Sequence, residues 1–104
     1  MSAPKQVKIL GRRVKLQFTD IEDAYGEFSE LPHTIKIQEG LSPDILPQVL
    51  IHEMVHAALA ISGISTHQID EKVEEQICTV METAVPDIMT ALRRFKVEDF
   101  DEDT

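Results

Sequence analysis

Hydrophobic and polar side chains alternate along the first part of the chain, which is the pattern of half-buried β-strands. The apolar members of this alternation are Val7, Ile9, Val14, Leu16 and Phe18. Gly11 and Arg12 interrupt the alternation and are typical of a turn. We therefore predict a β-hairpin over residues 6–18.

A second region of alternation follows a polar stretch. Residues 20–33 contain Gly26 and Pro32, which break regular structure, and we expect a loop there. Isoleucine then alternates with polar residues over 34–38, and Gly40 follows. This pattern predicts a third strand that ends at the glycine.

The pattern changes to a nearly continuous apolar run at residues 49–61, which is typical of a helix buried on most sides. Ser42 followed by Pro43 is a typical helix start, with a hydroxyl N-cap and a proline in the first turn. Pro47 falls within the early turns and can bend the helix, and Gly63 closes it.

A last helical region is expected to begin near Ile69. Its apolar residues recur at helical spacing and are Val73, Ile77, Val80, Met81, Ala84 and Ile88. Pro86 predicts a break or kink, with a final short helix that ends near Lys96. The acidic residues 98–104 are predicted to form a solvated tail, which leaves residues 1–97 as a single domain.

The charge of the chain narrows the set of expected partners. With a net charge of −9, the protein is expected to bind nucleic acid phosphates poorly. Five basic residues gather near the N-terminus, at Lys5, Lys8, Arg12, Arg13 and Lys15. They form either a solvated hairpin face or a contact for an acidic partner.

Cysteine content and hydropathy indicate the compartment. Cys78 is the only cysteine, so no intrachain disulfide is possible, which suits a reducing environment. No apolar run reaches the roughly 18 residues that a membrane span requires. Residues 1–8 lack the apolar segment of a signal peptide. We therefore expect a cytoplasmic protein that does not contact a membrane.

The central chemical motif is His52-Glu53-Met54-Val55-His56. Side chains four residues apart lie on one face of a helix, so the two imidazoles can share one tetrahedral zinc ion, Zn2+. Glu53 leans toward the same side and can act as general base toward water that the zinc acidifies. The alternatives are a small exposed polar strip or hydrogen-bonded core histidines, although polar groups in so apolar a helix are costly to bury unsatisfied.

A hydrolytic zinc site needs a third protein ligand. The downstream candidates are His67, Asp70, Glu71, Glu74 and Glu75. On a helical wheel centred on Ile77, Glu74 lies at the edge of the apolar face and Glu75 points to solvent. Asp70 is placed to cap or begin the helix. We therefore predict Glu74 as the third ligand, with His67 of the preceding loop as its rival.

Three other side chains have weaker claims on the site. Tyr25, the only tyrosine, could steady an oxyanion, although packing or a turn contact is the plainer interpretation. His33 precedes the third strand and could meet substrate or simply lie on the surface. Cys78 lies off the centre of the apolar face, and we assign it no role.

Two stretches carry a family resemblance: Thr34-Ile-Lys-Ile-Gln and Val49-Leu-Ile-His-Glu-Met-Val-His-Ala. They resemble minimal zincin-fold metallopeptidases, in particular small phage and bacterial metallopeptidases, which are similar in turn to the SprT-like and ImmA/IrrE-like groups. The resemblance spans roughly residues 25–90 and is specific only at 50–58.

The resemblance implies zinc ligation by His52 and His56, a catalytic Glu53, and an edge strand before the motif helix. It also implies that a glutamate from a later helix is the third ligand. The stretch Glu71-Lys-Val-Glu-Glu-Gln-Ile is similar to the start of that helix, and its register leaves Glu74 and Glu75 both open. With one cysteine, the chain lacks the zinc ribbon of some SprT-like proteins.

Together these patterns predict an α+β, zincin-like domain, in which a small antiparallel sheet packs on the motif helix and a C-terminal third-ligand helix. The expected activity is zinc-dependent hydrolysis of peptide bonds in a peptide or protein substrate, which would pair with an edge strand at 34–38. One alternative is a non-catalytic, zinc-stabilised interaction or adaptor module in phage or bacterial regulation, with His67 as fourth ligand. Another is a hydrolase of small amides.

Overall fold

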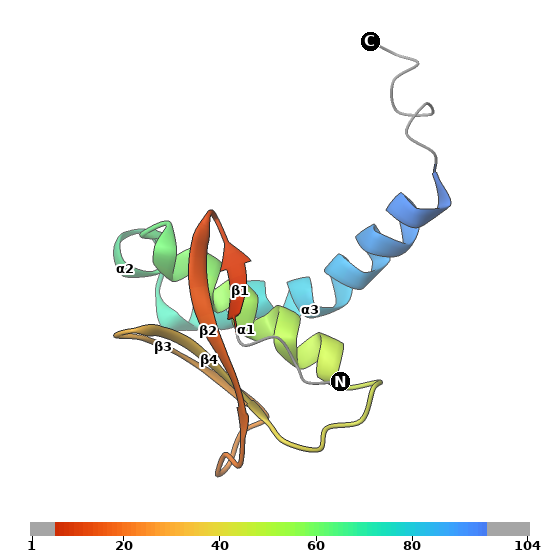
Figure 1. Cartoon of the computed structure of the whole chain (residues 1–104). Coiled ribbons are helices and arrows are strands. Elements are labelled where there is room, and N and C mark those ends of the chain that lie inside the picture. The colour runs from red at the N-terminus through yellow and green to blue at the C-terminus, as the bar shows by residue number, and fades with distance from the viewer. Residues whose placement is uncertain (1–5, 96–104) are drawn as a thin grey trace.

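Two long helices and a four-stranded sheet make up the fold (Figure 1). The computed structural model describes residues 6–95, apart from the side chains of Thr66 and His67. The strands are β1 Gln6–Ile9, β2 Arg12–Thr19, β3 Gly26–Glu30 and β4 His33–Gln38. The helices are α1 Leu46–Ile61, the short α2 Ile64–His67 and α3 Glu71–Arg94. The protein is therefore of the α+β class, as the hydrophobic pattern predicts.

The sheet is mixed, so the prediction of an antiparallel sheet is wrong. Its strand order is β1-β2-β4-β3. β1 and β2 form the predicted hairpin and β3 pairs with β4 in a second antiparallel pair, but β2 and β4 run parallel. β4 therefore has a neighbour on each side. The expectation that residues 34–38 form an edge strand is wrong, because β3 covers that edge.

β3 occupies a segment for which the sequence predicts a loop. Phe28 is its only large apolar residue, and glutamates stand on both sides of it at positions 27 and 30. Edge strands are commonly protected by charged residues, so such a strand lacks the apolar alternation that reveals a buried one. Pairing with β4, rather than its own composition, makes this segment a strand.

α1 begins at Leu46, later than the Ser42-Pro43 pair predicts. The N–H groups of Ile45 and Leu46 both donate to the carbonyl of Ser42, at 3.1 and 2.9 Å, in a turn that leads into the helix. Pro47 stands in the first turn of α1, where its missing N–H costs no hydrogen bond, so the helix starts there instead of bending.

α1 packs on one face of the sheet and also on α3 (Figure 1). The core between α1 and the sheet consists of Ile9, Val14, Leu16, Ile35, Ile37 and Ala57. No residue of α1 from Val49 to Ile61 is exposed, as predicted, yet only Glu53 and Ala57 are fully buried. The burial of a glutamate at the centre of an apolar helix indicates a candidate functional site.

α3 is one continuous helix, so the break predicted at Pro86 is wrong. Asp70 caps it as predicted, because its carboxylate accepts a hydrogen bond from the N–H of Val73 at 2.9 Å. Strong helix formers two or three positions from the proline, Ala84 and Met89, favour continuation, whereas its direct neighbours Val85 and Asp87 do not. The C-terminal half of α3 extends beyond α1 (Figure 1). Lys96 and the predicted tail at 98–104 lie outside the described residues. Among the described helices, none has the length and apolar character that a membrane span requires.

The face that α3 presents to α1 differs from the predicted one. Cys78 is the only fully buried residue of α3, one position and therefore about 100° around the helix from Ile77. Val73, Val80 and Ile88 are instead 38%, 64% and 51% exposed. The helix turns a face rich in glutamate toward α1 and leaves part of its apolar face in solvent.

Candidate metal centre

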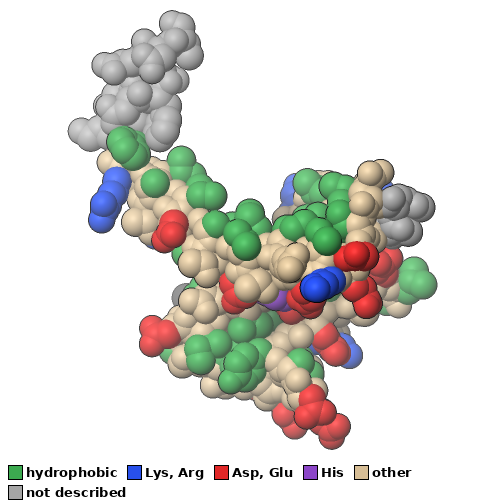
Figure 2. All heavy atoms as spheres, turned by 180° about the vertical axis from the view of Figure 1, so that it is seen from behind, with side chains coloured by type: hydrophobic (Ala, Val, Ile, Leu, Met, Phe, Trp, Pro, Cys, Tyr) green, Lys and Arg blue, Asp and Glu red, His purple; other side chains and the backbone are tan. Residues whose placement is uncertain are grey.

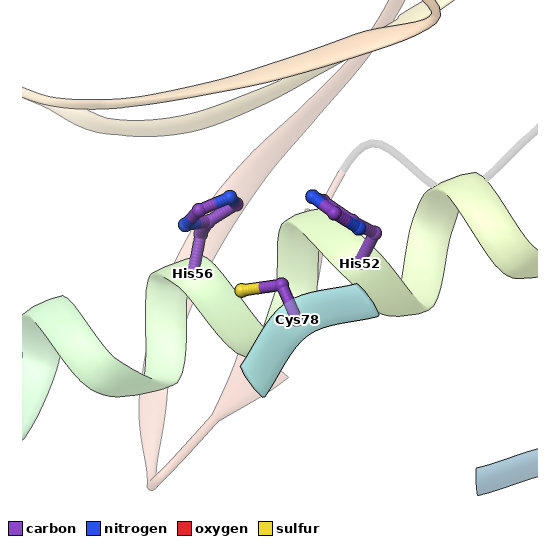
Figure 3. Close-up of side chains that lie close together, drawn as sticks. All are labelled: His52, His56 and Cys78. Carbon is purple, nitrogen blue, oxygen red and sulfur yellow. The ribbon is translucent and has the colours of Figure 1, made fainter. Parts of the chain in front are cut away.

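The motif on α1 places two imidazoles and one carboxylate around a single helical turn. The rings of His52 and His56 have centroids 5.0 Å apart and are steeply inclined to one another. Both rings rise from the same side of α1, as i and i+4 residues must (Figure 3). The sequence prediction that these two side chains share one face is therefore confirmed.

Glu75 of α3 meets both imidazoles with a single oxygen. Its Oε1 lies 2.9 Å from Nε2 of His52 and 3.2 Å from Nε2 of His56. The side chain is 60% exposed, which agrees with its solvent-facing position on the helical wheel, but its carboxylate reaches back to the histidines. Two nitrogens and one oxygen from two helices thus converge at one point.

The other nitrogen of each imidazole contacts a different carboxylate of α3. Nδ1 of His56 lies 2.5 Å from Glu74 Oε2, and Nδ1 of His52 lies 3.3 Å from Glu82 Oε1. A carboxylate on the far nitrogen sets the tautomer and the orientation of a ligating histidine. Each ring is therefore held in place by one glutamate while its other nitrogen faces Glu75.

Glu82 has no counterpart in the sequence prediction. It stands seven residues after Glu75, two turns along α3, so both side chains lie on the same face of the helix. A search for acids spaced by two turns could have found it. On a helical wheel centred on Ile77, Glu82 lies on the polar side near Glu75, so the apolar pattern does not predict it as a site residue.

Glu53 is buried against the edge strand, with only 7% of its surface exposed. Gly26 of β3 makes this possible, because a Cβ at position 26 would lie 2.9 Å from Cγ of Glu53. Burial raises the pKa of the Glu53 carboxyl, and the nearby His56 and His52 oppose that effect without cancelling it. A carboxylate with raised proton affinity suits a group that must accept a proton near neutral pH.

The histidines and Glu75 influence one another's protonation. Burial alone would lower the pKa of His56, but the hydrogen bond to Glu74 and the charges of Glu53 and Glu75 outweigh burial and raise it. Burial would likewise raise the pKa of Glu75, but hydrogen bonds and charge from His52 and His56 lower it. Without a metal, hydrogen bonds between the imidazoles and the carboxylates hold the cluster together.

Cys78 lies directly beneath the two histidines, and sequence reasoning assigned it no role. Its sulfur and one nitrogen each of His52 and His56 all lie within 4.8 Å of one another. Figure 3 shows the thiol reaching from α3 toward the rings on α1. Burial, together with the charges of Glu75 and Glu74, raises the pKa of the thiol to about 12. The thiol is thus a metal-ligand candidate that its surroundings keep protonated in the metal-free protein.

Two hollows flank the histidines along β3, and both are lined by Gly26 and Glu53. The larger, of about 500 Å³, runs along the whole of β3 beside His56. The smaller, of about 210 Å³, lies beside His52 and includes Tyr25. The cluster therefore stands between two hollows, and the larger forms a groove that follows the edge strand.

The remaining candidates from the sequence lie in different places. Asp70 is occupied as the cap of α3, and Glu71 lines the larger hollow. His33 stacks on Phe28, with ring centroids 5.9 Å apart. The side chain of His67 lies outside the described part of the structure.

Comparison with known proteins found no matching family model, no similar characterised protein and no similar solved structure. The geometry of the site and the sequence motif are therefore the two features that point to a function.

Proposed function

We propose that this protein is a zinc-dependent hydrolase that cleaves peptide bonds. The observation that carries the proposal is the convergence of His52 Nε2, His56 Nε2 and Glu75 Oε1. In this proposal Glu75 is the third ligand, and Glu74, the residue favoured by the helical wheel, orients His56. The zincin-like character expected from the sequence motif belongs to the same proposal.

The donor set fits zinc in both spacing and charge. Ligands at about 2.0–2.1 Å from a tetrahedral ion stand roughly 3.3 Å from one another. The two distances from Glu75 to the imidazoles, 2.9 and 3.2 Å, are close to that separation. Two imidazoles, one carboxylate and a fourth position left to solvent match the ligand number of hydrolytic zinc sites.

The surrounding carboxylates also favour a bound cation. Glu53, Glu74, Glu75 and Glu82 all face the two histidines. Like charges gathered in a partly buried interface repel one another unless a counter-charge offsets them. A divalent cation between the imidazoles provides that counter-charge.

When bound, zinc supplies Lewis-acid chemistry, which polarises a carbonyl oxygen and acidifies water. Glu53 acts as general base in this proposal: its carboxylate accepts a proton from water and returns it to the leaving amine. Its burial and raised pKa favour both transfers, because proton affinity near the working pH is best for a group that takes and releases a proton. Glu74 and Glu82 are positioning residues that act through the imidazole rings.

The groove favours an extended peptide as substrate. β3 is an edge strand, and the larger hollow follows all five of its residues, Gly26–Glu30, and reaches His56. An extended chain can pair with an open strand edge through main-chain hydrogen bonds. Strand addition is therefore assigned to β3, in place of the segment 34–38 expected from the sequence.

Zinc titration of purified single variants tests the ligand set. Glu75→Ala and His52→Ala are expected to weaken zinc binding by on the order of 100-fold or more. Glu74→Ala, which removes only an orienting contact, is expected to weaken it by roughly 10–100-fold. A wild-type protein that takes up no zinc would overturn the proposal. A larger loss for Glu74→Ala than for Glu75→Ala would instead make Glu74 the ligand.

The thiol of Cys78 supports one rival, a closed and non-catalytic zinc site. A fourth protein ligand would fill the position that a hydrolytic site keeps open. Cys78→Ala separates the two functions. Unchanged zinc affinity in this variant supports the open, catalytic site, whereas a loss as large as that of Glu75→Ala supports a structural one.

A further inference from the structure

The exposed face of α3 carries a continuous apolar stripe. Its members are Val73, Ile77, Val80, Ala84, Ile88, Ala91 and Leu92. Val80, Ile88 and Leu92 are 64%, 51% and 56% exposed, and no described residue covers them. Figure 2 shows this row of hydrophobic side chains along the edge of α3 that faces away from the sheet. An exposed apolar patch of a few hundred Å² is often a functional interaction site.

The same stretch of helix is depleted of charge. Charged residues make up 28% of the chain, yet residues 76–92 contain only Glu82 and Asp87. Glu82 faces His52 at the metal centre, so it is absent from the exposed face. The other polar residues in this stretch of the helix are uncharged, namely Gln76, Thr79, Thr83 and Thr90. Depletion of charge is the compositional mark of the centre of a protein interface.

The five central residues of the stripe are placed symmetrically about Ala84, whereas Val73 and Leu92 have no counterpart within the stripe. Seven residues separate Ala84 from Ile77 and from Ala91, and four separate it from Val80 and from Ile88. If two α3 helices pack antiparallel about a two-fold axis at Ala84, Val80 meets Ile88 of the other copy and Ile77 meets Ala91. Ala84 then faces Ala84 of the other copy, and Ala91 faces Ile77. A small side chain in each of these pairs lets the helices approach closely.

We propose that a second copy of this chain covers the stripe, with the two α3 helices antiparallel and crossing at Ala84. The projecting C-terminal half of each helix then lies on the first half of its partner (Figure 1). A two-fold interface requires a self-complementary surface, and the symmetric placement of the five central stripe residues meets that requirement. An unrelated partner would not require such symmetry.

The area is sufficient for a dimer of modest strength. The stripe from Val73 to Leu92 is about 30 Å long and about 10–12 Å wide, from the rise and diameter of a helix. Two such faces amount to roughly 600–700 Å², which is the size of weak, transient interfaces. Each protomer carries a charge of −9, so the two copies also repel, and added salt is expected to strengthen the dimer by screening.

Sedimentation velocity across about 1–100 μM protein tests the proposal, because a small interface is expected to give a weak dimer that forms at micromolar concentrations. Ile88→Glu and Val80→Glu are expected to weaken association by roughly 100-fold or more, since each buries an unpaired carboxylate. Thr90→Glu is the matched control, with the same added charge on the same helix but away from the stripe, and it is expected to dimerise like the wild type.

Cysteine cross-linking is a second test, and it needs no charged substitution that could prevent folding. In Ala84→Cys, the two new thiols face each other across the axis, so a short bis-maleimide is expected to link two chains in high yield. Thr79→Cys, which faces away from the stripe, is expected to link poorly. The native Cys78 is fully buried, which keeps the background low. A wild type that remains monomeric at 100 μM, or equal linking of both variants, would overturn the proposal. Binding of the monomer to lipid vesicles would assign the stripe to a membrane surface instead.

Discussion

At the scale of single residues, the roles of the α3 glutamates follow from the imidazole nitrogen that each one faces. Glu75 contacts Nε2 of both rings, whereas Glu74 and Glu82 contact Nδ1 of one ring each. Neighbouring carboxylates on one helix can therefore have different chemical tasks, one toward the proposed metal position and one toward a single imidazole ring. The difference between Glu74 and Glu75 is a rotation of about 100° around the helix axis.

The role of Glu53 predicts a separation of binding from catalysis. Glu53→Gln is expected to bind zinc with nearly unchanged affinity and to lose hydrolysis by on the order of 100-fold or more, because only the proton transfer is removed. Cleavage of a quenched fluorescent peptide library, together with zinc titration, measures both. Loss of zinc by a folded Glu53→Gln protein would identify Glu53 as a ligand and contradict its role as base.

The hydrogen bond between Glu74 and His56 predicts a pH dependence of the metal-free protein. The pKa of His56 is raised in the folded state, so its contribution to stability is present below the unfolded pKa of about 6.5 and is lost as pH rises through the folded pKa. Glu74→Gln removes the largest effect that raises this pKa. We expect the pKa of His56 to fall and stability below pH 6.5 to decrease.

Titration of the histidine ring protons by NMR measures this change directly. Glu71→Gln is the matched control, because it removes a carboxylate from the same turn of α3 that does not contact His56. A pKa of His56 that stayed unchanged in Glu74→Gln would mean that the hydrogen bond does not control its protonation.

At the scale of elements, α3 is attached to the domain by polar contacts. Only Cys78 is fully buried on this 24-residue helix. The contacts between α3 and α1 include four imidazole–carboxylate pairs. Apolar burial usually supplies most of the stability with which a helix packs. The position of α3 is therefore expected to depend on whether a metal ion is bound to the imidazoles of His52 and His56.

Zinc is expected to stabilise the docking of α3 selectively. At a thousandfold excess over Kd, a ligand adds about 4 kcal/mol to the stability of the folded state. Hydrogen exchange should show slower exchange in α3 and α1 with zinc than with chelator, and much less change in the β1–β2 hairpin. In Glu75→Ala this difference should shrink greatly, while Glu71→Ala should retain it. Uniform protection across the whole chain would argue against selective docking.

The contact between β3 and α1 makes a further prediction at this scale. Gly26→Ala would bring a Cβ to 2.9 Å from Cγ of Glu53 and 3.0 Å from Cγ1 of Val49. Overpacking of this kind costs typically about 1–3 kcal/mol, so the variant should unfold at lower denaturant concentration. Glu53→Ala removes the group that the new methyl meets. Gly26→Ala should therefore cost clearly less in a Glu53→Ala background, and equal costs would show that the two residues are not in contact.

At the scale of the whole molecule, the sheet, α1 and α3 have different structural roles. The sheet buries the apolar core, β3 supplies an open edge along the groove, and α1 carries the motif between them. α3 completes the site with one face and exposes the apolar stripe on another. The proposed metal centre and the proposed dimer therefore share one helix, and pairing of two copies would also hold the glutamates against the histidines.

The sequence by itself determined the features that depend on neighbours along the chain. The alternation of apolar residues predicted the β1–β2 hairpin and β4, and the i, i+4 spacing placed His52 and His56 on one face. Asp70 was recognisable as a cap because a cap bonds to N–H groups only a few residues away. Each of these features is set by local geometry, which a single sequence contains in full.

Only the tertiary structure decided the features that depend on distant segments. The edge strand β3 exists through its pairing with β4, and that pairing moves β4 from the edge to the interior. The rotation of α3 follows from the site: contacts between its glutamates and the histidines of α1 turn the acidic face inward, against the apolar pattern on which the prediction relied. A hydrophobic pattern shows which face of a helix is apolar, but the partner determines which face is covered.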